Sequence, residues 1–302
     1  MHCVTFIACA LAVIGSGCGS DDKPKPPPPP TDGTELLESG AAPRTALRYK
    51  LAPSISDSAL QLAIDVDLTT PDLDLELPTI LLGVDLTITT VDPDGTAHLK
   101  MTVATAGAEA RNASDNPAMK IMDRQTKLLA GTAVTYGLTP SGAVKDTKVA
   151  ESNRDLSGPM QDQVTTLLQA SEQLAMALPA KPVGVGAVWK HRRTMKLNQL
   201  TLVTVTLVEV VAIDGDKVTF KSTTEMTGAD QTLAQGSATA QVTAVRGTGS
   251  QTGTFELGRA ILLGESKATL GFEMITDGAR RPTTMTLTTR ITPREPVEPP
   301  KP

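Results

Sequence analysis

The stretch that decides the fold is Leu60-Gln61-Leu62-Ala63-Ile64-Asp65-Val66-Asp67-Leu68-Thr69. Leu, Ile and Val recur at every second position of this stretch, and the positions between them are mostly Gln, Asp and Thr. Successive side chains of an extended strand point to opposite faces, so the alternation predicts a β-strand with one apolar and one polar face. The sequence therefore indicates a sheet that buries one of its two faces.

Two β-hairpins are predicted by the same alternation. In each, two alternating segments flank a short turn that contains Asp-Gly, where Gly adopts a positive φ at little cost. The strands and turns are 80–88, 92–95 and 99–103 in the first hairpin and 200–213, 214–216 and 218–224 in the second. Another strand is expected to end in the turn at Gly137 to Gly142, and alternation from Met285 to Ile291 predicts the last strand.

The two hairpins also raise the question of an internal duplication. Aligning Asp94-Gly95 with Asp214-Gly215 places the two regions 120 residues apart, and each half then forms a β-meander. Strands rich in Thr and Val resemble one another by composition alone, so convergence of generic β patterns explains the likeness equally well. The sequence leaves both explanations open.

One amphipathic helix is predicted between the halves, over residues 157–178. Ser157 suits the N-cap position, Pro159 suits the first turn, and Pro179 ends the helix. Its apolar residues recur at helical spacing and are Met160, Val164, Leu167, Leu168, Leu174 and Leu178. A shorter helix is expected at 119–129. The predicted fold class is therefore mainly β (α+β): two antiparallel β-meander halves with one amphipathic helix packed on the sheet.

The first residues show the pattern of an export signal. Residues 4–14 form an apolar run of the length of a signal-peptide core, too short for a permanent membrane span. The next residues, Gly15-Ser16-Gly17-Cys18-Gly19-Ser20, resemble the lipobox of bacterial lipoproteins, in which a peptidase cuts before the cysteine. The resemblance implies that Cys18 becomes the lipid-bearing first residue and, with Gly19 rather than Asp after it, that the protein is sorted to the outer membrane. The alternative is an ordinary signal peptide with an incidental cysteine.

A proline-rich linker is predicted after Cys18. Pro26 to Pro30 are consecutive, which favours an extended polyproline II conformation and a semi-rigid spacer over a ligand for a peptide-binding domain. The predicted organisation is a signal peptide at 1–17, a lipidated, disordered linker at 18–44, a single β-rich domain at 45–292 and a disordered tail at 293–302. The two halves of the domain are 45–154 and 179–292, joined by the helix at 157–178.

A second resemblance is carried by the segment Leu178-Pro179-Ala180-Lys181-Pro182-Val183-Gly184-Val185-Gly186-Ala187-Val188-Trp189. This segment, Leu47 to Leu51 and the Gly137 to Gly142 turn are similar to an uncharacterised family of secreted bacterial proteins, over about 45–293. The resemblance implies export and a β-rich fold, and it implies no activity because the family has none assigned. From the residues themselves, a chain with one Trp is expected to use it for packing, so Trp189 is predicted to be buried at the first strand of the second half.

Motifs for catalysis or cofactor binding are missing from the sequence. The net charge of −5, with no Lys/Arg stripe, argues against nucleic-acid binding. All three cysteines lie in the first 18 residues, so disulfides and thiolate metal sites are excluded from the domain. His98 and His191 lie in different halves, and neither has a motif partner for a metal site or a catalytic triad. The run from Gly247 to Gly253 has no following Lys to hold a phosphate and is predicted to be a flexible hairpin loop. No catalytic residue, cofactor or metal is therefore predicted.

Two charged clusters remain to be interpreted. Acidic rows are formed by Asp65, Asp67, Asp72, Asp74 and Glu76. A solvated strand face is favoured for them over a Ca²⁺ site, because Ca²⁺ sites need a turning loop that brings six or more oxygens together. His191-Arg192-Arg193 is a short basic cluster that suits an anionic partner or a lipid head group.

These observations predict a cell-envelope lipoprotein that is not an enzyme. The Leu- and Val-rich, aromatic-poor interior favours a binding protein for an apolar ligand or an envelope partner, attached to the membrane through Cys18. The alternative is a structural or interaction scaffold with a fully packed core and no small-molecule ligand. A carboxylate pair with raised pKa values in a pocket would be needed to revive an enzyme hypothesis.

Overall fold

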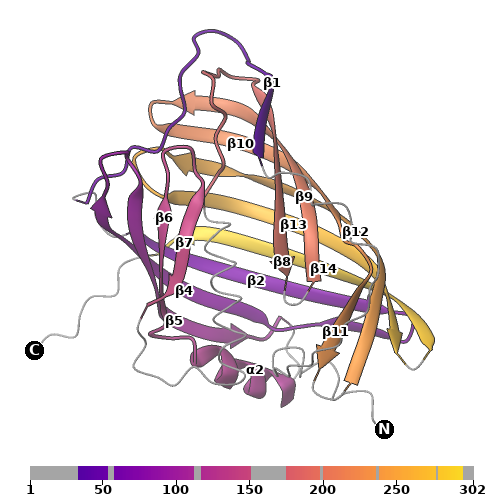
Figure 1. Ribbon diagram of the computed structural model, residues 1–302. Helices are drawn as coiled ribbons and strands as arrows, with labels where there is room; N and C mark the ends of the chain where they lie inside the picture. Colours follow the sequence, from indigo (N-terminus) through magenta and orange to yellow (C-terminus); the bar gives the residue numbers. More distant parts are fainter. Residues whose placement is uncertain are drawn as a thin grey trace, which may run out of the picture.

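A computed structural model describes residues 33–53, 58–111, 117–150, 175–197, 200–235, 238–276 and 278–294. These residues form one antiparallel sheet of 14 strands in the order β1-β8-β9-β10-β12-β13-β14-β2-β4-β5-β6-β7, with β11 beside β12 and β3 beside β2. Figure 1 shows that the sheet is strongly curved, with β6 and β7 on one side and β8 and β9 on the other. The mainly-β fold is confirmed.

The elements of the first half are β1 (Gly33–Glu38), β2 (Ser58–Thr70), β3 (Leu73–Glu76), β4 (Thr79–Val91), β5 (Ala97–Glu109), α2 (Pro117–Lys127), β6 (Ala133–Leu138) and β7 (Val144–Val149). The elements of the second half are β8 (Val188–Leu197), β9 (Leu200–Asp214), β10 (Lys217–Thr227), β11 (Gln231–Gln235), β12 (Ala238–Glu256), β13 (Ile261–Thr276) and β14 (Ala279–Pro293). The long alternating strand predicted from Leu60 to Thr69 is part of β2, and the short helix expected at 119–129 corresponds to α2.

Both predicted hairpins are present. β4 pairs with β5, Gly95 in their turn has a φ of +83°, and the Asp94 carboxylate accepts a hydrogen bond of 2.8 Å from the backbone N–H of Thr96. β9 pairs with β10, and Gly215 in their turn has a φ of +57°. The Asp-Gly turns therefore act as the sequence predicts, since both hairpins need a residue that tolerates positive φ.

The two halves form one continuous sheet. β14, the last strand, pairs with β2, so that Leu287 lies opposite Val66 and Ile291 lies opposite Leu62. The two halves are therefore joined by strands that are far apart in the sequence. Arg290 on β14 and Asp65 on β2, for example, are 225 positions apart. Such non-local pairing carries a large loop-closure cost, and it places residues from both halves on the same sheet faces.

The main core lies on the inner, concave face of the sheet. Its largest fully buried side chains include Trp189, Phe220 and Phe255, and the same cluster extends to Leu99 and Leu138 on β5 and β6. Strands near opposite ends of the sheet order thus share one core, which requires the curvature seen in Figure 1. Tyr49 joins this core with its ring centroid 6.5 Å from that of Phe255.

Two irregular segments, 39–51 and 175–187, link turns of the two halves, and we call them the clasp. The backbone N–H of Tyr49 donates to the Pro140 carbonyl in the β6–β7 turn, at 2.9 Å. The backbone N–H of Lys50 donates to the Leu257 carbonyl after β12, at 2.8 Å. Because these bonds satisfy the buried backbone of an irregular segment, the clasp is part of the folded domain and not a solvated connection.

The segment that resembles the secreted family belongs to the clasp and serves structure. Val183 and Thr45 exchange two backbone hydrogen bonds of 2.8 and 2.9 Å, and the Arg48 guanidinium donates to the carbonyls of Pro179 and Ala180, each at 2.7 Å. Gly184 lies so close to residue 41 that a Cβ atom would overlap that residue's carbonyl oxygen. The missing side chain of Gly184 therefore allows close backbone contact between the two segments of the clasp.

Trp189 is fully buried at the start of β8, as predicted. Its indole N–H donates a hydrogen bond of 3.0 Å to the Ala177 carbonyl, and the Tyr49 hydroxyl accepts one of 3.0 Å from the Met176 backbone N–H. Both aromatic residues therefore bury their rings while their polar atoms bind the 175–187 segment of the clasp.

Three predicted boundaries are corrected. The linker does not extend to residue 44, because Gly33–Glu38 forms β1 and pairs with β8. Residues 175–178 are not helical, since the backbone N–H groups of Met176 and Leu178 bind Tyr49 and Ser141 rather than a preceding turn. The remainder of the predicted helix, 157–174, lies outside the described residues, as does Cys18. The tail begins later than residue 293, because Pro293 belongs to β14.

The glycine-rich run from Gly247 to Gly253 is not a hairpin loop. It lies in the middle of β12, with β10 paired along one side and β13 along the other. The composition suggested a loop because glycine is poor at forming strands. Pairing on both sides compensates for that weakness, and glycine in a strand often marks a bend or a close backbone approach.

Candidate functional site

One row of cross-strand neighbours crosses the inner face of the sheet from β8 to β2. The residues that lie opposite one another along this row are His191, Thr206, Thr224, Gly249, Ala268, Leu287 and Val66. The next row towards the main core contains Ser222, Gln251, Ser266, Thr289 and Ile64. We call these two rows the waist, because they separate two apolar clusters of the same face.

The apolar clusters flank the waist on both sides. The first is the main core, which includes Trp189, Phe220 and Phe255. The second consists of Leu200, Leu202, Met226, Val242, Val245 and Leu270, with further partly buried side chains around it. Alternation along β9, with Leu202 and Val208 on the same side as Thr206, places both clusters on the inner face. The concave surface therefore changes from apolar to small and polar and back to apolar along the strands.

The waist itself changes in polarity across the strands. Its β9 and β10 part carries Thr206 and Thr224, whose hydroxyls are 2.9 Å apart in a hydrogen bond. Its β14 and β2 part carries the facing pair Leu287 and Val66, which are half-buried and belong to neither apolar cluster of the described residues. Half-buried aliphatic side chains beside hydroxyl and amide groups offer both apolar contact and hydrogen bonds to a small molecule.

Two glycines allow β12 and β13 to approach closely beside the waist. Gly253 and Gly264 lie opposite one another on β12 and β13, next to the waist. Gly264 has a φ of +153°, and a Cβ atom there would overlap the Thr252 carbonyl oxygen. A Cβ atom on Gly253 would overlap the Leu263 carbonyl oxygen. The two strands approach closely at this point, which is how glycines introduce curvature into a sheet.

The predicted charged residues are distributed over both faces. His191 lies on the inner face, where its Nδ1 is 3.1 Å from the Thr34 hydroxyl, whereas Arg192 points to the opposite face by alternation. His98 lies in the other half, and its Nε2 is 2.8 Å from the Asp92 carboxylate. The two histidines are therefore not brought together, and the described residues contain no group of three or more His, Asp or Glu side chains suited to a metal ion.

The acidic row of β2 is not simply a solvated face. Asp65 is only 7% exposed, and its carboxylate accepts hydrogen bonds from the Thr79 hydroxyl at 2.6 Å and from Arg290 at 2.7 Å. Burial raises the pKa of Asp65, but the Thr79 hydrogen bond and the Arg290 charge outweigh it and hold the pKa below its ordinary value. Asp67 forms an ion pair with Arg111. These carboxylates form ion pairs with arginines that the sequence pattern alone did not connect to them.

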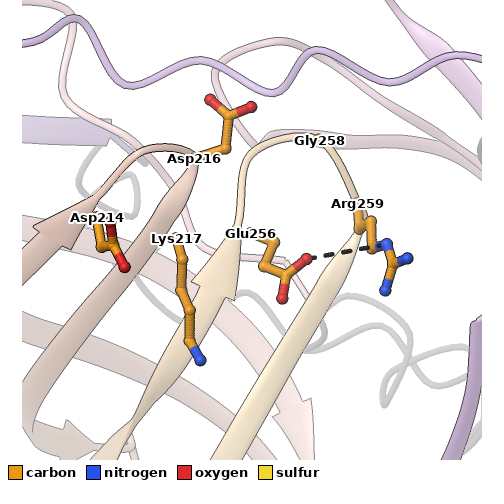
Figure 2. Close-up of a pocket in the computed structure, with 6 residues that line it drawn as sticks. All are labelled: Asp214, Asp216, Lys217, Glu256, Gly258 and Arg259. Atoms are coloured by element: carbon orange, nitrogen blue, oxygen red, sulfur yellow. Dashed lines mark ion pairs between the residues drawn. The ribbon is translucent and has the colours of Figure 1, made fainter.

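A shallow depression of about 410 Å³ lies beside the β9–β10 and β12–β13 turns. It is lined by Asp214, Asp216, Lys217, Glu256, Gly258 and Arg259 (Figure 2). Figure 2 shows the Asp216 carboxylate pointing away from those of Asp214 and Glu256, and Glu256 forms a long ion pair of 3.9 Å with Arg259. Asp214 and Glu256 both lie opposite Lys217 in one cross-strand row, so an ammonium group stands between these two carboxylates at the junction of the turns.

Comparisons with known proteins add no functional information. No family model and no curated protein matches the chain. Among solved structures, a protein of unknown function from the DUF3598 family of Nostoc punctiforme aligns over 77% of this chain and 95% of its own chain, with 8% identity and a TM-score of 0.11. That likeness is too weak to support an argument. Within the described residues, no helix is long and apolar enough to cross a membrane.

The waist has no recognisable signature in the sequence. Its members are common strand residues such as Thr, Ser and Leu, and they come from seven strands. The only local signal is the glycine-rich run of β12, whose composition predicts a loop. The waist becomes visible once the register between distant strands is known.

Proposed function

We propose that this chain is a non-catalytic binding protein of the cell envelope that holds an apolar ligand on the inner face of its sheet. The observation that carries the proposal is the facing pair Leu287 and Val66, half-buried on the concave face and outside both apolar clusters. Aliphatic side chains at such positions gain free energy when a ligand removes them from water. The hydroxyl and amide groups of Ser222, Gln251 and Thr289 would orient a small polar group on the same ligand.

The proposal includes an acyl anchor at Cys18 and a location at the outer membrane. The lipobox-like residues around Cys18 support it, and Gly33 at the start of β1 connects the proline-rich segment directly to the sheet. Diacyl or triacyl attachment would hold the domain at the membrane stably, whereas one acyl chain alone binds only marginally. Replacing Cys18 by Ser should release the protein from the membrane fraction, and mass spectrometry of the wild-type N-terminal peptide should find the acyl groups.

The part of the predicted amphipathic helix that remains, residues 157–174, is proposed to pack on the same concave face. Met176 and Leu178, which follow that part in the chain, are buried in the main core, which supports this placement. The helix would then form one wall of the ligand site. The two meander halves are compatible with an internal duplication, which the alignment of the two Asp-Gly turns supports.

A scaffold without a small ligand is the second candidate function. It is favoured by the size of the main core, which unites both halves through the clasp. In that case the helix would fill the concave face completely. The two functions differ in one measurable property, which is saturable binding of an apolar molecule to the inner face.

The test is binding of N-phenyl-1-naphthylamine, an apolar fluorophore, to the chain from residue 18 onward with Cys18→Ser. We expect saturable fluorescence enhancement, and Leu287→Asn should weaken it about tenfold, because one aliphatic contact is replaced by a polar group. Thr288→Asn is the matched control, because Thr288 is the next residue of β14 and faces the opposite side of the sheet. Absence of saturable binding, or equal binding by the two variants, would favour the scaffold.

A further inference from the structure

The two faces of the sheet differ in the sign of their ionisable side chains. From β8 to β5 in the sheet order, register and alternation place the Asp and Glu side chains of the strands on the outer face or at the turns, as they do for Asp65 and Glu209. The ionisable side chains on the inner face of the same strands are all basic, and they are His191, Arg193 and Arg281. The protein has a net charge of −5, yet this face of the described strands carries basic groups alone. A face of that character favours an anionic ligand.

His191 and Arg193 form a basic pair on one face of β8. They are two positions apart on an extended strand, so their Cα atoms are about 7 Å apart and both side chains point to the inner face. His191 ends the first row of the waist, and Arg193 lies opposite Thr204, one row further towards the second apolar cluster. Both basic side chains are half-buried. A ligand that lies along the waist therefore has two basic groups at its β8 end.

Hydroxyl groups lie beside the basic pair. The Thr34 hydroxyl is 3.1 Å from the His191 Nδ1, and Thr206, the residue opposite His191, has its hydroxyl 2.9 Å from that of Thr224. The Arg193 guanidinium has several N–H donors in a planar fork, so it can hold a carboxylate in two parallel hydrogen bonds and keep further partners within the protein. Because an ionised carboxylate only accepts hydrogen bonds, the donors at this end of the waist suit it.

The waist also constrains the length of the ligand. Along its first row, the small residues Gly249 and Ala268 follow the hydroxyl groups, and the half-buried Leu287 and Val66 come after them. β14 is the fifth strand after β8 in the sheet order, so at about 4.8 Å per strand Leu287 is about 24 Å from His191 along the sheet. The small residues between them allow an extended chain to lie close to the backbone. A compact anion cannot contact both ends of this row, whereas a long acyl chain with one acidic end can.

We propose that the ligand of the inner face is a long-chain carboxylate, whose acidic group lies at the basic pair and whose apolar chain extends along the waist towards Leu287 and Val66. The proposal rests on the proposed function and deepens it, because it names the class of the ligand and the direction in which it lies. A charge-assisted hydrogen bond is stronger at a half-buried position than in water, so Arg193 contributes affinity as well as orientation. Arg192, its neighbour in the sequence, faces the outer side and has no part in binding.

The test compares two ligands of equal chain length on the chain from residue 18 onward with Cys18→Ser. Palmitate and the uncharged palmityl alcohol are each used to displace bound N-phenyl-1-naphthylamine, and the loss of fluorescence gives their affinities. We expect palmitate to bind about tenfold more tightly than the alcohol, because only the acid carries a charge that the basic pair attracts. This comparison needs no substitution in the sheet, so it does not depend on the folding of a variant.

Two adjacent arginines supply matched variants. Arg193→Gln should weaken palmitate binding about tenfold and leave the binding of palmityl alcohol unchanged. Arg193→Lys keeps the charge without the planar fork, and it should recover part of the lost affinity. Arg192→Gln is the control, because it removes the same charge one position away on the outer face of β8 and should change neither affinity. Circular dichroism confirms that the variants are folded.

The outcomes separate this proposal from the proposed function. Equal affinities for palmitate and palmityl alcohol, or equal losses of palmitate binding in Arg193→Gln and Arg192→Gln, would overturn the carboxylate ligand and leave an apolar ligand on the inner face. Palmitate binding that Leu287→Asn does not weaken would overturn the path of the chain along the waist. Absence of saturable binding by the fluorophore and by both ligands would overturn the proposed function, and the carboxylate ligand with it.

Discussion

The Arg290 guanidinium on β14 lies 2.7 Å from the Asp65 carboxylate on β2, although the two residues are 225 positions apart in the chain. The pair sits where the last strand meets the first long one, and Asp65 is almost fully buried. A charged hydrogen bond in that environment is worth more than one at the surface, and breaking it leaves a buried group without its partner. The pair therefore helps to hold the two halves of the sheet together.

Replacing Asp65 by Asn should lower the free energy of unfolding by about 1–3 kcal/mol at neutral pH. The folded-state pKa of Asp65 lies below its ordinary value, so its contribution is present above the unfolded-state pKa of about 4 and is lost as pH falls through the folded-state pKa. The difference in stability between wild type and Asp65→Asn should therefore shrink below about pH 4. Urea denaturation at several pH values measures it, and a difference that stays constant would contradict the assignment.

Replacing Gly264 by Ala should destabilise the domain by about 1–3 kcal/mol, because the residue combines a φ of +153° with no room for a Cβ atom. Gly271→Ala is the matched control on the same strand, since a Cβ atom there would lie 3.8 Å from the nearest atom, the Arg246 carbonyl oxygen. Thermal denaturation of the two variants should show a lower midpoint for Gly264→Ala and a small change for Gly271→Ala. Equal midpoints would mean that β13 does not need a glycine to bend.

The fold class and the hairpins could be predicted because their signals are local. Alternation from Leu60 to Thr69 and the Asp-Gly turns at Gly95 and Gly215 each depend on a few neighbouring residues. β1 could not be predicted in the same way. Gly33–Glu38 has no strong alternation and follows a proline run, and it becomes a strand because β8 offers it an unpaired edge.

The candidate site depends on register, which is why sequence patterns did not reveal it. Leu287 and Val66 face one another only because β14 pairs with β2, and the same pairing brings Arg290 to the buried Asp65. The glycines of β12 suggested a loop, since the strand partners that stabilise them come from β10 and β13. Local propensity is overruled at these positions by pairing between distant segments.

Neither tyrosine of the chain should ionise near its ordinary pKa while the protein is folded. Tyr49 and Tyr136 are both buried, and burial raises the pKa of each well above 10. Their raised folded-state pKa values mean that their contribution to stability is fully present below about pH 10 and is lost as pH rises above it, because the unfolded chain ionises first. Absorbance at the tyrosinate band should therefore rise in one step together with unfolding. A rise that precedes loss of the circular dichroism signal would show that one of them is exposed.

Breaking the clasp should be visible in the emission of Trp189, the single tryptophan of the chain. Arg48→Met removes the bonds from the guanidinium to the Pro179 and Ala180 carbonyls and leaves both carbonyls without that donor. We expect a loss of about 1–3 kcal/mol in unfolding free energy. Trp189 is fully buried, so its emission shifts to the red when water reaches the indole, and this shift should come at lower urea than in wild type. Lys50→Met is the control, since Lys50 is exposed and its backbone bond to Leu257 is kept. If both variants unfold like wild type, backbone pairing such as that of Thr45 with Val183 holds the clasp without help from the guanidinium.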